Sequence, residues 1–372
     1  PASNRKTGFV GKTRILLVER FNLESQIIKI VAQLSSSPSE ESIPVIAKPY
    51  HAPLFEHPLT ALEPHALLTK FRFLKLDEKN RVFSVIPGNW RVPSMLILPQ
   101  GYSLRIDAGT TLDFTADAGI VVHGPTQFHG TQTAPIQFIA DRERGGIWKG
   151  IAVFNANQPS VWRYVTVSNV GPMNLGDWQL TGAVTFYRSD VSIVSSKFNS
   201  TVAEDALNII NSHFFIDNSI FSNAQSDGFD GDFVKGSIHR SRFHQIGYGG
   251  GGDAIDLSGS VAQISDCQFN DVQDKAVSAG ERSNTEISGA TFSNVNIGVV
   301  SKDLSKVTIS DSNVISFVTA AAMVYSKKSE YGPASLIVES SSFGGDAKNI
   351  IVQTHSTAIV NGVQMESIPL DV

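Results

Sequence analysis

The stretch that decides the fold is residues 205–314, because it aligns with itself. As successive lines it reads DALNIINSHFFIDNSIFSN (205–223), DGFDGDFVKGSIHRSRFHQ (227–245), DAIDLSGSVAQISDCQFND (253–271), KAVSAGERSNTEISGATFSN (275–294) and GVVSKDLSKVTISDSNVIS (298–316). A fixed period of this length is the signature of a repeat architecture. One apolar column recurs every 22 to 26 residues and holds Phe198, Phe221, Phe243, Phe269, Phe292 and Val314.

Each line contains short runs in which apolar and polar residues alternate, such as 254–258 and 307–310. Alternation with a period of two predicts strands that bury one face. The repeat is too short for a propeller blade and has no helical half, so we expect an all-β solenoid, a parallel β-helix, in which one repeat forms one coil. Coils stacked about 4.8 Å apart would satisfy one another's backbone groups.

The chain divides into two regions by pattern. Weaker coil-like runs precede the clear repeats, and they place the β-helix at residues 96–372. Residues 1–95 differ, since 21–34 has apolar residues at helical spacing and 71–85 resembles a hairpin. A solenoid needs its open end covered, so we interpret residues 1–95 as a small α+β N-terminal cap. An independent module is the alternative.

Composition excludes several classes of protein. The chain has 372 residues and a net charge of -5, which argues against a general nucleic-acid binder. No apolar run reaches the roughly 18 residues that cross a bilayer, so no membrane span is expected. The start of the sequence does not have the pattern of a signal peptide. The single cysteine, Cys267, excludes an internal disulfide and a cysteine-based zinc cluster, and we expect it to be buried packing.

Three further segments carry a family resemblance: Gly-Tyr-Ser-Leu (101–104), Ala-Gly-Thr-Thr-Leu (108–112) and Trp-Lys-Gly-Ile (148–151). Followed by the repeats, they resemble the right-handed parallel β-helix proteins of the pectate-lyase-like superfamily. The resemblance implies a right-handed coil and work on acidic or complex polysaccharides as a lyase, hydrolase, epimerase or esterase. It also implies a secreted, periplasmic or cell-surface protein. The superfamily includes surface and phage proteins without chemistry, so the fold alone does not settle function.

Acidic residues recur on one predicted face. Asp205 and Asp227 lie at the start of successive coils, as does Asp253, and Lys275 takes that place on the fourth coil. Stacked carboxylates about 5 Å apart repel each other unless a proton, a cation or a basic side chain compensates them. We therefore predict a functional site on this face. Its acidic members are Asp227, Asp230, Asp232, Asp253 and Asp256.

Calcium is the cation that this predicted site suggests, because it takes several oxygen ligands. Bound calcium would clamp a uronate carboxylate and acidify the proton at C5 of the sugar. A neutral Lys275 would remove that proton, with Arg282 stabilising the enolate or serving the leaving group and Asp253 beside them. This predicts a lyase that cleaves an acidic polysaccharide by calcium-assisted β-elimination. The expected calcium ligands are Asp227, Asp230, Asp232 and Asp256, and the expected substrate-binding residues are Arg240, Arg242, Tyr248 and His239.

Two other functions stay open. Ser-Asp-Gly-Phe-Asp (226–230) and Gly-Asp-Ala-Ile-Asp (252–256) look like the two aspartate motifs of polygalacturonases, in which one carboxyl is the acid and another activates water, as in inverting hydrolysis. That family's Gly-His-Gly step and Arg-Ile-Lys motif are not found, which ranks hydrolysis below elimination. The other class is a non-catalytic β-helix that binds glycan or another surface molecule. Each aspartate would then cap a turn, and Lys275 would form a salt bridge to Asp253.

Overall fold

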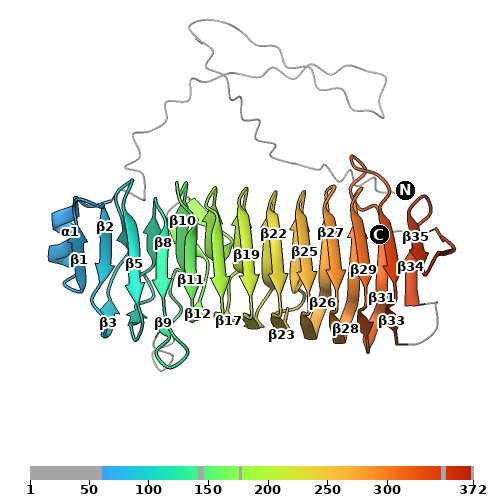
Figure 1. Ribbon diagram of the computed structural model, residues 1–372, viewed down its shortest axis with the longest axis horizontal. Coiled ribbons are helices and arrows are strands. Elements are labelled where there is room, and N and C mark those ends of the chain that lie inside the picture. The colour runs from blue at the N-terminus through green and yellow to red at the C-terminus, as the bar shows by residue number, and fades with distance from the viewer. Residues whose placement is uncertain (1–60, 141–145, 176–177, 345–348, 370–372) are drawn as a thin grey trace, which may run out of the picture. The chain divides into compact units, whose positions relative to one another are not determined.

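The computed structural model describes residues 61–140, 146–175, 178–344 and 349–369, which belong to one compact unit (Figure 1). The helix expected at 21–34 lies outside these residues. Within them, the α-helical element is the short α1 (Pro64–Lys70), and the rest of the regular structure is strand. None of the described helical segments is both long and apolar enough to cross a membrane.

The strands form three ladders, because each coil contributes one strand to each of three faces. Neighbouring strands within a ladder are parallel. Ladder A consists of β2 (Val82–Val85), β5 (Ser103–Asp107), β8 (Thr126–His129), β11 (Ser160–Arg163), β16 (Val191–Val194), β19 (His213–Asp217), β22 (Lys235–His239), β25 (Val261–Ser265), β27 (Asn284–Ser288), β29 (Lys306–Ser310), β32 (Ser335–Glu339) and β35 (Thr357–Val360).

Ladders B and C form the other two faces. Ladder B consists of β4 (Leu96–Ile97), β7 (Ile120–Val122), β10 (Ile151–Phe154), β15 (Gly182–Tyr187), β18 (Asp205–Ile210), β21 (Asp227–Asp232), β24 (Ile255–Ser258), β31 (Phe317–Tyr325) and β34 (Ile350–Val352). Ladder C consists of β3 (Asn89–Val92), β6 (Thr111–Phe114), β9 (Ile136–Ala140), β12 (Val165–Val170), β17 (Lys197–Thr201), β20 (Ile220–Ala224), β23 (Arg242–Ile246), β30 (Asn313–Val314) and β33 (Ser342–Phe343). The long strands β26 (Gln268–Gly280) and β28 (Thr291–Lys302) run through ladder C and then ladder B.

The phenylalanine column that the repeat predicted is the spine of the core. Phe221, Phe243 and Phe269 are register partners on successive strands of ladder C. The ring centroids of Phe221 and Phe243 are 4.7 Å apart, those of Phe243 and Phe269 are 5.2 Å apart, and all three side chains are buried. The column continues to Val314 and Phe343 at the C-terminal coils. The predicted alignment of the repeats is therefore confirmed.

A second column, of serines, satisfies the backbone at the turn from ladder A to ladder C. The backbone N–H of Ser196 donates to Oγ of Ser219 at 3.2 Å, and that of Ser219 donates to Oγ of Ser241 at 3.1 Å. Cys267 follows Ser241 in this column and is fully buried, with Sγ 3.3 Å from the carbonyl oxygen of Ser265. The expected burial of the cysteine is confirmed.

The two ends of the described unit are closed by antiparallel strands. At the N-terminal end β1 (Leu74–Asp77) pairs with β2, which confirms the hairpin, and α1 lies at the end of the stack (Figure 1). At the other end β36 (Val363–Gln364) pairs with β35. Parallel pairing starts at β2 and β3, which is before the predicted boundary at residue 96. A cap comprising residues 1–95 stays a prediction.

Candidate active site

The acidic residues that the sequence singled out converge on the outward side of ladder B. Asp205 pairs with Asp227 between β18 and β21, and Asp230 pairs with Asp256 between β21 and β24. The side chains between them in the sequence, such as Phe229, point inward and are fully buried. We call this surface the acidic face, and its carboxyl groups are those of Asp205, Asp227, Asp230, Asp232, Asp253 and Asp256.

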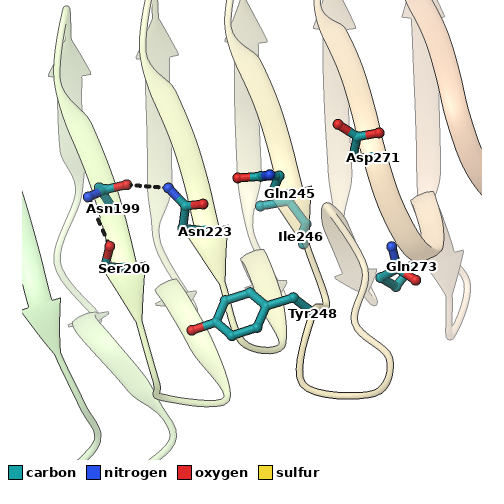
Figure 2. Close-up of a pocket in the computed structure, with 8 residues that line it drawn as sticks. All are labelled: Asn199, Ser200, Asn223, Gln245, Ile246, Tyr248, Asp271 and Gln273. Atoms are coloured by element: carbon teal, nitrogen blue, oxygen red, sulfur yellow. Dashed lines mark hydrogen bonds between the residues drawn. The ribbon is translucent and has the colours of Figure 1, made fainter.

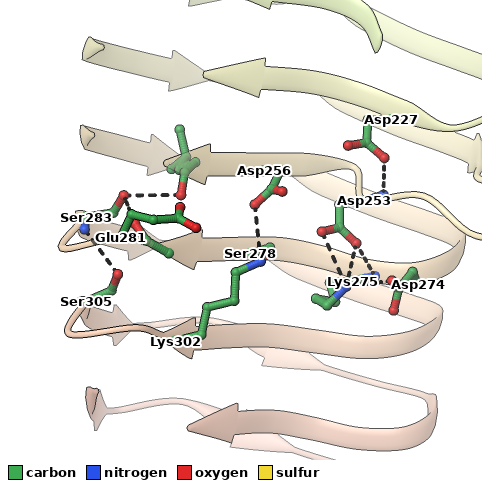
Figure 3. Close-up of polar contacts among 12 residues, drawn as sticks. Asp227, Asp253, Asp256, Asp274, Lys275, Ser278, Glu281, Ser283, Lys302 and Ser305 are labelled. Carbon is green, nitrogen blue, oxygen red and sulfur yellow. Dashed lines mark hydrogen bonds and ion pairs between the residues drawn. The ribbon is translucent and has the colours of Figure 1, made fainter. Parts of the chain in front are cut away.

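The first column of the acidic face consists of Asp205, Asp227, Asp253 and Lys275 at the start of successive coils. Two of its carboxyls accept hydrogen bonds from the backbone of the next coil (Figure 3). Oδ1 of Asp227 accepts the backbone N–H of Asp253 at 2.8 Å, and Oδ1 of Asp253 accepts the backbone N–H of Lys275 at 3.0 Å. Burial raises the pKa of Asp205 to about 7, and burial together with the charge of Asp253 raises the pKa of Asp227 to about 8. These carboxyls therefore hold the coils in register at the cost of part of their charge.

Lys275 completes this column as an ion pair (Figure 3). Its Nζ lies 3.1 Å from Oδ1 of Asp253 and 2.5 Å from Oδ2 of Asp274. Burial lowers the pKa of Lys275, but the two carboxylates raise it by more, so the net shift is upward. The salt bridge that the sequence left open is thus present. In this arrangement Lys275 carries its proton at neutral pH and has no lone pair with which to act as a base.

The second column contains Asp230 and Asp256. It differs from the first column, because its described hydrogen bonds and ion pairs come from side chains. Nδ2 of Asn208 donates to Oδ2 of Asp230 at 2.7 Å. Nζ of Lys302 lies 3.7 Å from Oδ1 of Asp256 (Figure 3). Burial, followed by the charges of Asp205, Asp232 and Asp256, raises the pKa of Asp230 to about 9. At neutral pH Asp230 therefore holds a proton, and the neighbouring carboxyl of Asp256 lies beside Nζ of Lys302.

The C-terminal end of the acidic face carries a mixed set of charges. Burial raises the pKa of Asp232, the last residue of β21. Glu281 follows β26 at the corner between ladders B and A and pairs with Lys328. Arg282 is next in the chain, and its guanidinium lies 5.7 Å from the ring centroid of Tyr331. The predicted arginine therefore lies at the edge of the acidic face, stacked on an aromatic ring.

Three of the predicted substrate-binding residues lie at another corner of the coil. His239 ends β22 in ladder A, and its Nδ1 is 2.6 Å from Oγ of Ser265. Arg240 lies in the following turn and pairs with Asp217 at 2.5 Å, and Arg242 begins β23 in ladder C. The acidic face belongs to ladder B, so the structure does not bring these three residues to it. Tyr248 lies in the loop between β23 and β24 and lines a separate pocket.

Two contacts of the site were not predicted from the sequence. Lys302 is the cation beside Asp256, and Asp274 is the second partner of Lys275. Lys302 occupies the column of Asp232, three coils further on, so the repeat alignment contained the signal for it. Asp274 lies in the irregular segment of β26 between Val272 and Lys275, where the register shifts, and no column of the repeat predicts its direction.

The predicted calcium ligands show partial agreement with what a cation needs. Carboxylate oxygens are suitable donors, and among the described residues Oδ2 of Asp205 and Oδ1 of Asp256 are buried without a hydrogen-bond partner. However, in the described ranges no group of three or more His, Cys, Asp or Glu side chains is arranged to hold a metal ion. Asp227, Asp230, Asp232 and Asp256 share a face, and calcium binding by them stays a proposal.

Comparisons with known proteins concern the fold. The chain is similar to the periplasmic alginate epimerase AlgG (10% identity, 81% of this chain and 82% of that chain, TM-score 0.47). It is also similar to the catalytic domain of a GH87 alpha-1,3-glucanase in complex with nigerose (14% identity, 68% and 64%, TM-score 0.35) and to the gp42 tailspike of Acinetobacter phage vb_AbaP_AS12 (12% identity, 74% and 58%, TM-score 0.34). No curated protein matches the chain.

A family model agrees with the coil architecture. Residues 181–361 match the model described as the right handed beta helix region, and this segment contains the whole acidic face. The same residues form three ladders of parallel strands around a phenylalanine spine. Residues 181–361 therefore match a right handed beta helix region, and the described chain has the parallel β-helix fold that the sequence predicted.

Proposed function

We propose that the protein is a carbohydrate-active enzyme that hydrolyses glycosidic bonds on the acidic face, with Asp230 as proton donor and Asp256 as its carboxylate partner. The observation that supports this most directly is the pairing of these two residues in register on adjacent coils. Glycoside hydrolysis uses one carboxylic acid to protonate the leaving-group oxygen and one carboxylate to attack the sugar or activate water. A protonated and an ionised carboxyl side by side supply both roles.

The surroundings of the pair assign the two roles. The pKa of Asp230, raised by burial and by its acidic neighbours to about 9, keeps a transferable proton on this residue at neutral pH. Nζ of Lys302 lies 3.7 Å from Oδ1 of Asp256, which gives this carboxyl a cationic neighbour. The side chain of Asp256 is 27% exposed, so a sugar can reach it from solvent. Lys302 acts through Asp256 and is a positioning residue.

The charge of the acidic face bears on the substrate. A uronate carboxylate placed beside Asp256 would meet a charge of the same sign in a partly desolvated setting, which is unfavourable unless a cation intervenes. We therefore propose a neutral polysaccharide as the substrate of hydrolysis. Structural and surface polysaccharides lie outside the cell membrane, so the proposal includes a secreted, periplasmic or cell-surface location.

Calcium-assisted β-elimination of an acidic polysaccharide is the second candidate. It is favoured by the two buried carboxylate oxygens of Asp205 and Asp256 that accept no hydrogen bond in the described structure. Calcium bound there would neutralise the carboxyls and hold a uronate carboxylate. Lys275 would first have to leave Asp253 and Asp274 and lose its proton before acting as base. That extra cost ranks elimination below hydrolysis.

A substrate panel separates the candidates. The protein is incubated with neutral glucans and xylans, pectate, alginate and glycosaminoglycans, with calcium or with a chelator. Hydrolysis predicts new reducing ends from a neutral glycan, without the ultraviolet absorbance of unsaturated uronates, and no effect of the chelator. Unsaturated products that require calcium would support elimination. Binding without any product would contradict both reactions and favour the non-catalytic class.

A further inference from the structure

A polar pocket distinct from the acidic face lies on the outside of ladder C (Figure 2). Its volume is about 810 Å³, and it spans the four successive strands β17, β20, β23 and β26. None of the carboxyls of the acidic face lines it. The residues that line it are Asn199, Ser200, Asn223, Gln245, Ile246, Tyr248, Asp271 and Gln273.

The pocket wall repeats with the coil. Ser200, Asn223, Gln245 and Asp271 occupy the same place on four successive strands, each with a φ between 54° and 57°. This left-handed backbone bends the chain near the end of each strand, and the residues at the bend line one pocket. Polar groups therefore recur about every 4.8 Å along the helix axis. Such a row suits an extended chain that lies parallel to the axis.

The polar groups of the wall both donate and accept hydrogen bonds. Nδ2 of Asn223 donates to Oδ1 of Asn199 at 2.8 Å, and Nδ2 of Asn199 donates to Oγ of Ser200 at 3.0 Å (Figure 2). These bonds fix the orientation of the Asn199 amide. Gln245 and Gln273 add two further amides. An amide pairs with a sugar hydroxyl in either direction, since both groups contain a donor and an acceptor.

Tyr248 supplies an aromatic surface beside this row (Figure 2). Its side chain is 54% exposed, yet its loop is attached to the preceding coil. The backbone N–H of Gly247 donates to the carbonyl of Ala224 at 3.0 Å, and that of Gly249 donates to the carbonyl of Gln225 at 2.9 Å. Gly247 has a φ of 81°, which glycine adopts without strain. The backbone that carries the ring is therefore fixed before any ligand arrives, which lowers the entropic cost of stacking.

The charge of the pocket indicates what it would bind. Its lining, as far as the described residues show, contains no lysine or arginine, so it has no partner for a phosphate, sulfate or uronate. Its one carboxylate, Asp271, accepts a hydrogen bond from Nδ2 of Asn294 and lies 3.3 Å from Nδ1 of His244. Amides beside an exposed tyrosine match the hydroxyls and the C–H face of an uncharged sugar.

We propose that this pocket is a second carbohydrate site, which binds a linear neutral glycan along the axis of the helix with a sugar stacked on Tyr248. The site shares no residue with the acidic face, so it does not depend on hydrolysis there. A chain held on ladder C would keep a polymer close to the protein whether or not ladder B cleaves it.

The test is calorimetric titration with cellohexaose, laminarihexaose, xylohexaose and oligogalacturonate. Five forms of the chain are compared: wild type, Tyr248→Ala, Tyr248→Phe, Asp230→Asn and Phe215→Ala. Phe215 is the matched control, because it is an aromatic side chain with 40% exposure on ladder A. Melting temperatures establish that each variant is folded. Tyr248 lies in a loop, so its truncation leaves the coil contacts in place.

We expect at least one neutral hexasaccharide to bind and oligogalacturonate not to bind at this site. Tyr248→Ala should weaken the neutral ligand about tenfold, while Tyr248→Phe and Phe215→Ala keep wild-type affinity. Failure of every neutral sugar to bind would overturn the proposal. So would affinity that survives Tyr248→Ala, including the case in which only Asp230→Asn abolishes it and binding belongs to the acidic face. Absence of products in the substrate panel, with binding retained, would count against hydrolysis alone.

Discussion

Nζ of Lys275 lies 3.1 Å from Oδ1 of Asp253, its neighbour on the preceding coil. The same carboxylate oxygen accepts the backbone N–H of Lys275, so one aspartate is bound both to the main chain and to the side chain of the next coil. The first column of the acidic face thus ends in an attraction. In the second column Nζ of Lys302 lies 3.7 Å from Oδ1 of Asp256, and Asp230 beside it keeps a proton. We therefore distinguish Asp253, which stabilises the fold, from Asp230 and Asp256, which we propose to act in catalysis.

The ion pair predicts a stability effect for Lys275→Met. The side chain of Asp253 is 7% exposed, so removal of the ammonium would leave a buried carboxylate without its partner. We expect the free energy of unfolding at pH 7 to fall by about 3 kcal/mol, measured by urea denaturation. Lys275→Arg, which keeps the charge, should lose much less. Wild-type stability in Lys275→Met would contradict the structural role, and intact stability with lost turnover would indicate a catalytic one.

The raised pKa values of the acidic face predict that stability falls with pH. The folded protein keeps protons on Asp227 and Asp230 up to pH values of about 8 and 9, whereas an unfolded aspartate releases its proton near 3.8. Between these limits the folded state binds more protons, so the free energy of unfolding decreases as pH rises.

Asp230→Asn isolates one part of this slope, because asparagine is uncharged at every pH. Compared with wild type, the variant should gain thermal stability at pH 9 and show little gain at pH 5, measured by calorimetry across this range. Asp311→Asn is the control, since Asp311 is an exposed aspartate in a turn outside the acidic face. Parallel pH curves for wild type and Asp230→Asn would rule out a buried proton on Asp230.

The phenylalanine spine predicts where the core is most sensitive. Phe243 is fully buried between the rings of Phe221 and Phe269. Phe243→Ala would open a cavity that the flanking coils cannot close, so we expect a loss of about 3–5 kcal/mol in urea denaturation. Phe215→Ala, on an exposed position of ladder A, should cost less than about 1 kcal/mol. Equal losses of unfolding free energy for the two substitutions would mean that the stacked rings do not stabilise the core more than an exposed ring does.

The sequence predicted those features that depend on equivalent positions in successive repeats. The spine from Phe198 to Val314 and the stacking of Asp230 on Asp256 both follow from the spacing, because parallel coils place equivalent residues one above another. It failed where the position depends on the corner of the coil. His239 and Arg240 are close to Asp230 in the alignment, but His239 ends β22 in ladder A and Arg240 lies in the turn from ladder A to ladder C. The state of Lys275 depends on a local register shift that brings Asp274 to it.

The central claim is that Asp230 donates a proton to a glycosidic bond with Asp256 as its partner. The most direct measurement is the initial rate of reducing-end release from the best neutral glycan of the panel, in the presence of a chelator. The account predicts that Asp230→Asn and Asp256→Asn each lower this rate about a hundredfold or more at unchanged melting temperature near pH 6, while Asp311→Asn keeps it. Turnover at the wild-type rate in Asp230→Asn would contradict the account. So would a wild-type enzyme that is active without the chelator and inactive in its presence.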